Sequence, residues 1–144
     1  PLATTSDLDR ALEAAQRAWP AWRALGPQQR GRILRKAADL LRERSEAIAR
    51  LATLEEGKAL AESRVELNIA AEIFDWYAEE GRRAYGRVLP QRTAGVRMTV
   101  VKEPVGPVAG FAPWNFPLGN PARKLGAALG AGCTVIVKPA EPNP

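Results

Sequence analysis

Two short apolar runs near the end of the chain constrain the fold more than any other feature of the sequence. Residues 108–112 and 134–137 contain no charged or amide side chain, and residues 121–130 between them are rich in alanine and glycine. Strands without alternation of polar and apolar residues are typical of a parallel sheet that is covered on both faces. A helix between two such strands completes a right-handed βαβ unit. The sequence therefore predicts an α/β fold with a parallel sheet.

The first 95 residues differ in character from the rest, because they hold 14 of the 16 acidic residues and only four of the 12 prolines. Apolar residues recur there at helical spacing, which predicts three helices over residues 6–20, 27–57 and 59–81. Pro20 is expected to end the first helix and Gly57 the second. The buried side of the third helix is predicted to carry Val65, Ile69, Ile73, Phe74 and Trp76.

A β-hairpin is predicted between the helices and the βαβ unit. Residues 96–102 alternate between apolar and polar side chains, as a strand with one buried face does, and residues 86–89 are expected to pair with them.

Composition excludes several kinds of chemistry. With no histidine and only one cysteine, Cys133, the chain cannot supply a Ser-His-Asp triad, a Cys-His pair, a zinc-binding cysteine cluster or an internal disulfide. Cys133 stands at the predicted buried start of a strand, where a free cysteine acts as a small apolar residue rather than a nucleophile. No metal site is expected.

Charge and hydropathy give expectations about partners and location. The net charge of +5 comes from 21 basic and 16 acidic residues. Over residues 30–50 the two signs are interleaved, which favours a solvated helix face over a nucleic-acid-binding stripe. We find neither a signal peptide nor an apolar run long enough to span a membrane, so the expected location is the cytoplasm.

Polar and aromatic residues follow both apolar runs of the predicted βαβ unit. Ligands bind in open α/β sheets at the carboxyl ends of the strands, so both sets are expected to border one crevice. The first set is Pro113, Trp114 and Asn115. The second set is Lys138, Pro139, Ala140 and Glu141.

Asn115 has two possible roles on this evidence. Held by Pro113 and Pro117, its amide could donate a hydrogen bond to an oxyanion with little reorganisation. Alternatively, it could cap the helix that follows. The residues alone favour neither role.

Lys138 and Glu141 also allow two interpretations. A lysine that donates and a carboxylate that accepts hydrogen bonds suit the adjacent hydroxyls of a ribose, and the carboxylate would repel a 2′-phosphate. A loop ion pair is the alternative. Gly126, Gly130 and Gly132 do not form the common dinucleotide-binding fingerprint, and are predicted to allow close helix-to-sheet packing and to end the helix.

The motifs PWNFP at 113–117 and VKPAE at 137–141 together resemble the aldehyde dehydrogenase superfamily. Stretches at residues 14–25, 30–44, 55–63 and 102–108 resemble its N-terminal part. The resemblance implies an α/β fold in which N-terminal helices lead into an incomplete Rossmann-like parallel sheet of the aldehyde dehydrogenase fold. Residues 1–85 would be the N-terminal helical part of the cofactor-binding domain, 86–103 a hairpin of the oligomerisation region, and 104–144 the truncated start of the NAD-binding sheet.

The resemblance implies oxidation of an aldehyde to an acid with NAD(P). In this family a cysteine thiolate attacks the aldehyde, an asparagine that matches Asn115 holds the oxyanion, and a glutamate-activated water hydrolyses the thioester. Cofactor-binding residues, by the same match, are Phe111, Ala112, Pro113, Trp114, Lys138, Pro139, Ala140 and Glu141. Lys138 and Glu141 would bind the adenosine ribose, and Glu141 favours NAD over NADP. The nucleophilic cysteine and the general-base glutamate are expected downstream of this chain, so we expect the chain alone to be an inactive fragment.

The stretch at residues 122–141 is most similar to the succinate-semialdehyde dehydrogenase branch. There, an arginine that matches Arg123 contacts the substrate carboxylate, which a guanidinium binds through two donors. A solvent-facing helix charge is the alternative. The resemblance also implies a homo-oligomer formed partly through residues 96–102. A non-catalytic helical interaction module derived from this fold is the alternative to an enzyme.

Overall fold

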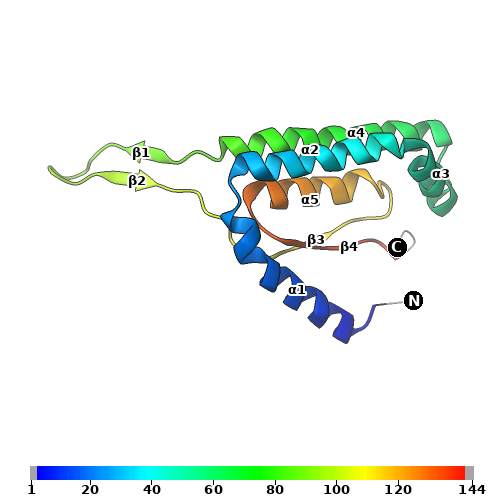
Figure 1. The fold of residues 1–144 in the computed structure, drawn as a ribbon, viewed down its shortest axis with the longest axis horizontal. Helices are drawn as coiled ribbons and strands as arrows, with labels where there is room; N and C mark the ends of the chain where they lie inside the picture. Colours follow the sequence, from blue (N-terminus) through cyan, green and yellow to red (C-terminus); the bar gives the residue numbers. More distant parts are fainter. Residues whose placement is uncertain (1–2, 142–144) are drawn as a thin grey trace.

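The computed structural model describes residues 3–141 and confirms the predicted α/β architecture (Figure 1). The outermost parts of the expected ranges 1–85 and 104–144 lie outside the described residues. The elements are α1 (Thr5–Ala24), α2 (Pro27–Glu43), α3 (Ser45–Glu56), α4 (Leu60–Glu80), a 3₁₀ turn η1 (Gly81–Arg83), β1 (Arg87–Leu89), β2 (Met98–Val100), β3 (Val108–Phe111), α5 (Gly119–Ala131) and β4 (Val135–Lys138).

Helix α1 is longer than predicted. It is capped by Thr4, whose side chain accepts a hydrogen bond from the backbone of Asp7, and it continues through Pro20 to Ala24. Proline removes the hydrogen bond to the carbonyl four residues earlier. Pro20 and Gln16 are both exposed, so water can serve that carbonyl, and the expectation that Pro20 ends the helix was wrong.

The single helix predicted over residues 27–57 is two helices. Arg44, with φ −101° and ψ 15°, interrupts it and separates α2 from α3. The break turns α3 against the start of α4, where Ala49 and Ala52 are buried. Thr53 and Ser63 also join the two helices through a hydrogen bond of 2.8 Å. Gly57, with φ 81°, ends α3 as predicted.

Helix α4 matches the predicted range but buries a different face. Phe74 is buried and Ile73 packs against the core, whereas Val65, Ile69 and Trp76 are exposed. The buried positions are instead mostly small residues, which let α4 approach α2 and α5 closely. The core cluster consists of Leu34, Ala38, Ala70, Ala71, Phe74, Ala78 and Ala122.

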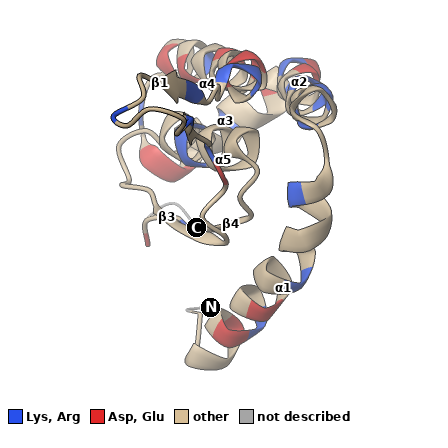
Figure 2. Ribbon diagram, turned by 90° about the vertical axis from the view of Figure 1, so that its left-hand side faces the viewer, with Lys and Arg blue, Asp and Glu red and all other residues tan. Residues whose placement is uncertain are grey.

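Basic side chains predominate on α2 and acidic side chains on the neighbouring α4 (Figure 2). The ion pairs Arg35–Glu79 and Arg42–Asp75 join the two helices. The interleaved charges of the sequence therefore form a mixed-sign surface here. Within the described part of the chain, no helix is long and apolar enough to cross a membrane.

Both predicted strand pairs are present. β1 and β2 form an antiparallel hairpin that projects from the body of the molecule (Figure 1). β3 and β4 pair in parallel with α5 as the crossover, and the register places Val108 opposite Val135. Gly132, with φ 92°, ends α5 as predicted. Gly126 and Gly130 face Tyr77 of α4, so the close packing is between helices and not between helix and sheet.

Candidate functional site

The two strand ends that were predicted to border one crevice lie side by side. Phe111 is opposite Lys138 in the parallel register, and the backbone N–H of Ala112 donates to the carbonyl of Lys138 at 3.0 Å. The structure thus brings residues 111 and 112 next to residue 138, where the segments 113–115 and 139–141 leave the strand pair. Phe111 is 71% exposed and Trp114 58% exposed, whereas Ala112 is buried. Two aromatic side chains are therefore accessible at the carboxyl end of the strand pair.

Lys138 and Glu141 are both exposed. The structure records no ion pair between these two described side chains, so the loop ion pair that the sequence allowed is not formed. A lysine and a carboxylate that are not bound to each other remain free to contact hydroxyl groups of a ligand. The buried Cys133 lies at the other end of β4, away from this edge.

Asn115 lies in the turn between β3 and α5, and it does not cap the helix. The N-cap of α5 is Leu118, which makes no side-chain capping hydrogen bond. The helix-capping alternative is therefore wrong. Asn115 instead lines a cavity of about 630 Å³ between this turn, α4 and the start of α5.

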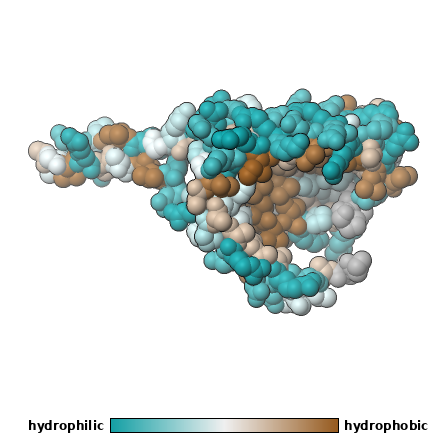
Figure 3. Space-filling model, in the orientation of Figure 1, coloured by the Kyte–Doolittle hydropathy of each residue, from teal (hydrophilic) through white to brown (hydrophobic). Residues whose placement is uncertain are grey.

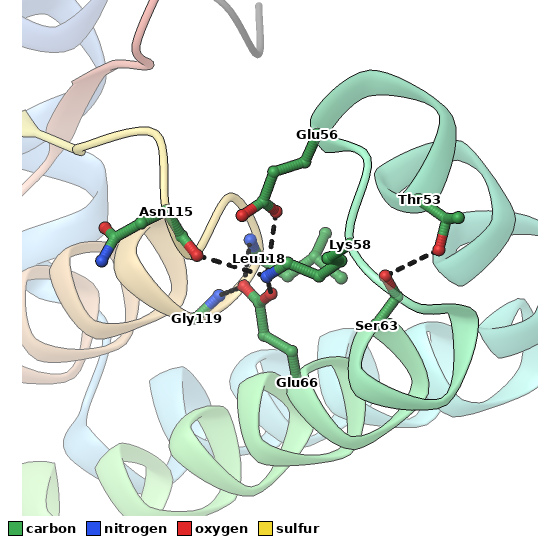
Figure 4. Close-up of polar contacts among 8 residues, drawn as sticks. All are labelled: Thr53, Glu56, Lys58, Ser63, Glu66, Asn115, Leu118 and Gly119. Carbon is green, nitrogen blue, oxygen red and sulfur yellow. Dashed lines mark hydrogen bonds and ion pairs between the residues drawn. The ribbon is translucent and has the colours of Figure 1, made fainter.

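Glu66 of α4 performs the capping that no local residue supplies. Its Oε1 accepts hydrogen bonds from the backbone N–H groups of Leu118 at 2.8 Å and Gly119 at 2.9 Å (Figure 4). Its Oε2 accepts a hydrogen bond of 2.5 Å from Nζ of Lys58. A carboxylate at the N-terminus of a helix is also favoured by the helix dipole.

Lys58 connects α4 to the Asn115 turn. Besides Glu66, it contacts Glu56 at 2.9 Å and donates to the backbone carbonyl of Asn115 at 3.2 Å. Burial lowers the pKa of Lys58, but its hydrogen bonds to Glu66 and Glu56 outweigh this, so that its pKa is raised above the usual value. The Lys58 ammonium is thus held in its charged form.

Lys58 and Glu66 were not predicted from the sequence. The position of Glu66 in its helix could have indicated its role, because it lies on the same face as Ser63 and Ala70, which are buried small residues. A carboxylate on the buried face of a helix requires a partner, since an unpaired buried charge is very costly.

Arg123 lines the same cavity as Asn115. Its guanidinium lies over Gly119, with Nη1 3.7 Å from the position that a Cβ on that residue would occupy. It is exposed, and no ion pair to a described carboxylate is recorded for it. Three carboxylates line the cavity. Glu56 and Glu66 are both bound to Lys58, and the exposed Glu62 makes no ion pair with Arg123. The guanidinium can therefore receive an anion from the cavity.

The family model and the similar proteins found by comparison agree with one another. The model of the aldehyde dehydrogenase family matches residues 1–144. The chain is 52% identical over 143 residues to 4-(hydroxymethyl)benzenesulfonate dehydrogenase TsaD1 of Comamonas testosteroni, covering 99% of this chain and 30% of that protein. It is 48% identical over 134 residues to succinate-semialdehyde dehydrogenase [NADP(+)] GabD of Escherichia coli, covering 93% of this chain and 28% of that protein. It is 40% identical to 3-sulfolactaldehyde dehydrogenase of Pseudomonas putida, covering 100% and 30%.

Solved structures share the fold. A crystal structure of succinate-semialdehyde dehydrogenase from Burkholderia pseudomallei has a TM-score of 0.95 and 47% identity, over 96% of this chain and 29% of that one. A crystal structure of PnpE in complex with nicotinamide adenine dinucleotide has a TM-score of 0.92 and 41% identity, over 96% and 28%. The chain spans about 30% of the length of the proteins that it matches.

Proposed function

Because the chain belongs to the aldehyde dehydrogenase family, we propose that it forms the N-terminal part of an enzyme that oxidises an aldehyde to a carboxylic acid with a nicotinamide cofactor. The observation that carries this proposal is the position of Asn115. Its turn follows the strand end beside the proposed cofactor residues and borders a cavity that also contains Arg123.

Asn115 would stabilise the oxyanion that forms when a nucleophile adds to the aldehyde. An amide N–H that is already oriented stabilises developing negative charge without reorganisation during the reaction. The nucleophilic cysteine and the general base would come from the remainder of the full-length protein. Cys133 is not a candidate, because it is buried.

The residues at the two strand ends, most of which are exposed, fit a dinucleotide. Phe111, Ala112, Pro113 and Trp114 would border the cofactor, and Lys138, Pro139, Ala140 and Glu141 would hold its adenosine half. When bound, the nicotinamide supplies a hydride acceptor. Lys138 can donate to a ribose hydroxyl and Glu141 can accept from one. Because a carboxylate repels a 2′-phosphate, we propose NAD in preference to NADP.

We propose that the substrate is an aldehyde with an anionic group, with succinate semialdehyde as the first candidate. The relatives described above are named for substrates that carry a carboxylate or a sulfonate. Of the two cations that line the cavity, Lys58 is already bound to Glu56 and Glu66, so Arg123 would bind such a group. Its planar guanidinium can donate two parallel hydrogen bonds to a carboxylate. Glu56 and Glu66 do not compete for it, since Lys58 binds both, and Glu62, the third carboxylate of the lining, forms no ion pair with it.

We further propose a homo-oligomer in which the hairpin, within residues 86–103, contacts another subunit. Residues 1–85 and 104–144 would belong to the cofactor-binding domain. Support for this division comes from the hairpin, which projects away from the rest of the chain (Figure 1).

The test of the proposed function is Asn115→Ala in the full-length protein that contains this chain. With succinate semialdehyde and NAD, kcat should fall about a hundredfold or more, because one oxyanion donor is lost. The matched control is Asn68→Ala, since Asn68 is an exposed asparagine on α4 outside the cavity lining, and it should leave kcat unchanged. An unaltered kcat in Asn115→Ala would remove the proposed role. No aldehyde oxidation by the unmodified full-length protein would favour the interaction module instead.

A further inference from the structure

A cluster of three charged side chains lies beneath the Asn115 turn. The side chains of Glu56, Lys58 and Glu66 are only 7%, 12% and 5% exposed. Burying charges is costly, and packing between helices alone would be served as well by apolar residues. The contacts of this cluster with the turn suggest a different reason for its presence.

Both charges of the Lys58–Glu66 pair contact the turn directly. Glu66 accepts from the backbone N–H groups of Leu118 and Gly119, at the point where the turn enters α5. Lys58 donates to the backbone carbonyl of Asn115. The turn is therefore fixed from α4 and from the loop before it, more than 50 residues away in sequence.

The side chain of Asn115 is left free by these contacts. In Figure 4 its carbonyl oxygen faces Lys58, while its side-chain amide points away from the cluster. Lys58 also lies 5.0 Å from the centroid of the Phe116 ring, a cation–π contact with the next residue of the turn. With its carbonyl and its C-terminal neighbours held, the backbone of Asn115 has little freedom to rotate and thereby to redirect the amide.

We propose that Glu66 and Lys58 are positioning residues, whose ion pair fixes the Asn115 turn so that its side-chain amide stays aimed at the site where the oxyanion forms. This inference rests on the proposed function, because it assigns Asn115 that role. Neither residue touches the substrate. They act through the backbone of the turn, and a displacement of about 1 Å there is enough to weaken a reaction that depends on orientation.

The test is a double-mutant cycle in the full-length protein. Glu66→Ala should lower kcat by roughly tenfold to a hundredfold, with KM for the aldehyde and Kd for NAD changed less than threefold. On the Asn115→Ala background the same substitution should cause no further loss of kcat, because the group that it positions is absent. A purely structural role would lower kcat by the same factor on both backgrounds. That result would overturn the proposal.

Two further variants keep the test decisive. Glu72→Ala is the matched control, because Glu72 is an exposed glutamate on the same helix, and it should leave kcat unchanged. Glu66→Gln keeps an acceptor for the two N–H groups and should retain kcat within about fivefold of the unmodified enzyme. If Glu66→Ala does not fold, the cycle is carried out with Glu66→Gln. Its smaller loss of kcat must then vanish on the Asn115→Ala background, and equal losses on both backgrounds would overturn the proposal.

The outcomes separate this inference from the proposed function. If Asn115→Ala alone has no effect on kcat, the proposed role of Asn115 fails and the positioning role fails with it. If Asn115→Ala is impaired and Glu66→Ala adds its full effect, only the positioning role fails.

Discussion

Glu66 and Arg123 border the same cavity but differ in how their charges are compensated. Glu66 is buried, and its two oxygens receive hydrogen bonds from Lys58 and from two backbone N–H groups. Arg123 is exposed, and no carboxylate in the described part of the chain pairs with it. Because both oxygens of Glu66 are hydrogen-bonded, this residue stabilises the structure around it. Because the guanidinium of Arg123 has no such partner among the described residues, it is available to a ligand.

We expect Arg123→Ala in the full-length protein to raise KM for succinate semialdehyde by about ten- to a hundredfold. A hydrogen bond to a charged group contributes about 1.5–3 kcal/mol, and the loss should appear in binding if the bond is equally strong in the ground state and the transition state. KM for butanal, which has no anionic group, should stay within threefold. Steady-state kinetics with both aldehydes measures the difference.

The exposed Arg32 of α2 provides the control, since it lies outside the cavity lining. Arg32→Ala should alter neither KM. Equal increases for succinate semialdehyde and butanal in Arg123→Ala would show that Arg123 does not recognise the anionic group.

For the candidate site, the sequence predicted which residues follow the two strands. Asn115, Lys138 and Glu141 come within four residues of the end of an apolar run, and the Phe111–Lys138 register places the ends of the two runs side by side. Glu66 could not be assigned in this way. Its partners at residues 118 and 119 are backbone groups more than 50 positions away, and a backbone N–H has no signature in the sequence.

At the scale of elements, the contacts of α4 depend on small residues. A Cβ added at Gly130 of α5 would lie 2.9 Å from the carbonyl oxygen of Tyr77, and one added at Gly31 of α2 would lie 2.8 Å from that of Ala78. Helical periodicity predicted α4 but chose its large apolar residues as the buried face. Trp76 is nevertheless 63% exposed, because close approach of α2 and α5 selects the face with alanine at 70, 71 and 78. Periodicity locates a helix, but the size of its neighbours decides which face is buried.

Gly130→Val should therefore destabilise the full-length protein by about 1–3 kcal/mol relative to Ala131→Val. The new side chain meets backbone of α4, which cannot retreat without moving the whole helix. Ala131 is the adjacent, exposed position on α5, so its valine variant controls for the lower helix propensity of valine. Urea-induced unfolding followed by circular dichroism measures the difference between the midpoints. Identical midpoints would mean that α4 and α5 can separate at no cost.

At the scale of the whole molecule, apolar side chains are exposed on several elements, and two of these areas are relevant to assembly. One is a broad apolar area beneath α2 (Figure 3), where a cavity of about 570 Å³ is lined mainly by small and apolar residues of α1, α5 and β4. The other is the hairpin, where Val88 is 82% exposed. Within the described residues, β1 and β2 pair only with each other. An isolated two-stranded hairpin is marginally stable in water, so a projecting one with exposed apolar side chains gains stability when another surface covers it.

If the hairpin contacts another subunit, Val88→Lys in the full-length protein should shift the oligomer toward smaller species, because a lysine ammonium would be desolvated in an apolar contact. Sedimentation velocity measures the distribution of species at several protein concentrations. Leu54→Lys is the matched control, since Leu54 is also 82% exposed but lies on α3, far from the hairpin in Figure 1. The control should sediment as the unmodified protein does. Dissociation by both variants would indicate general loss of solubility or folding, and dissociation by neither would place the subunit contact away from the hairpin.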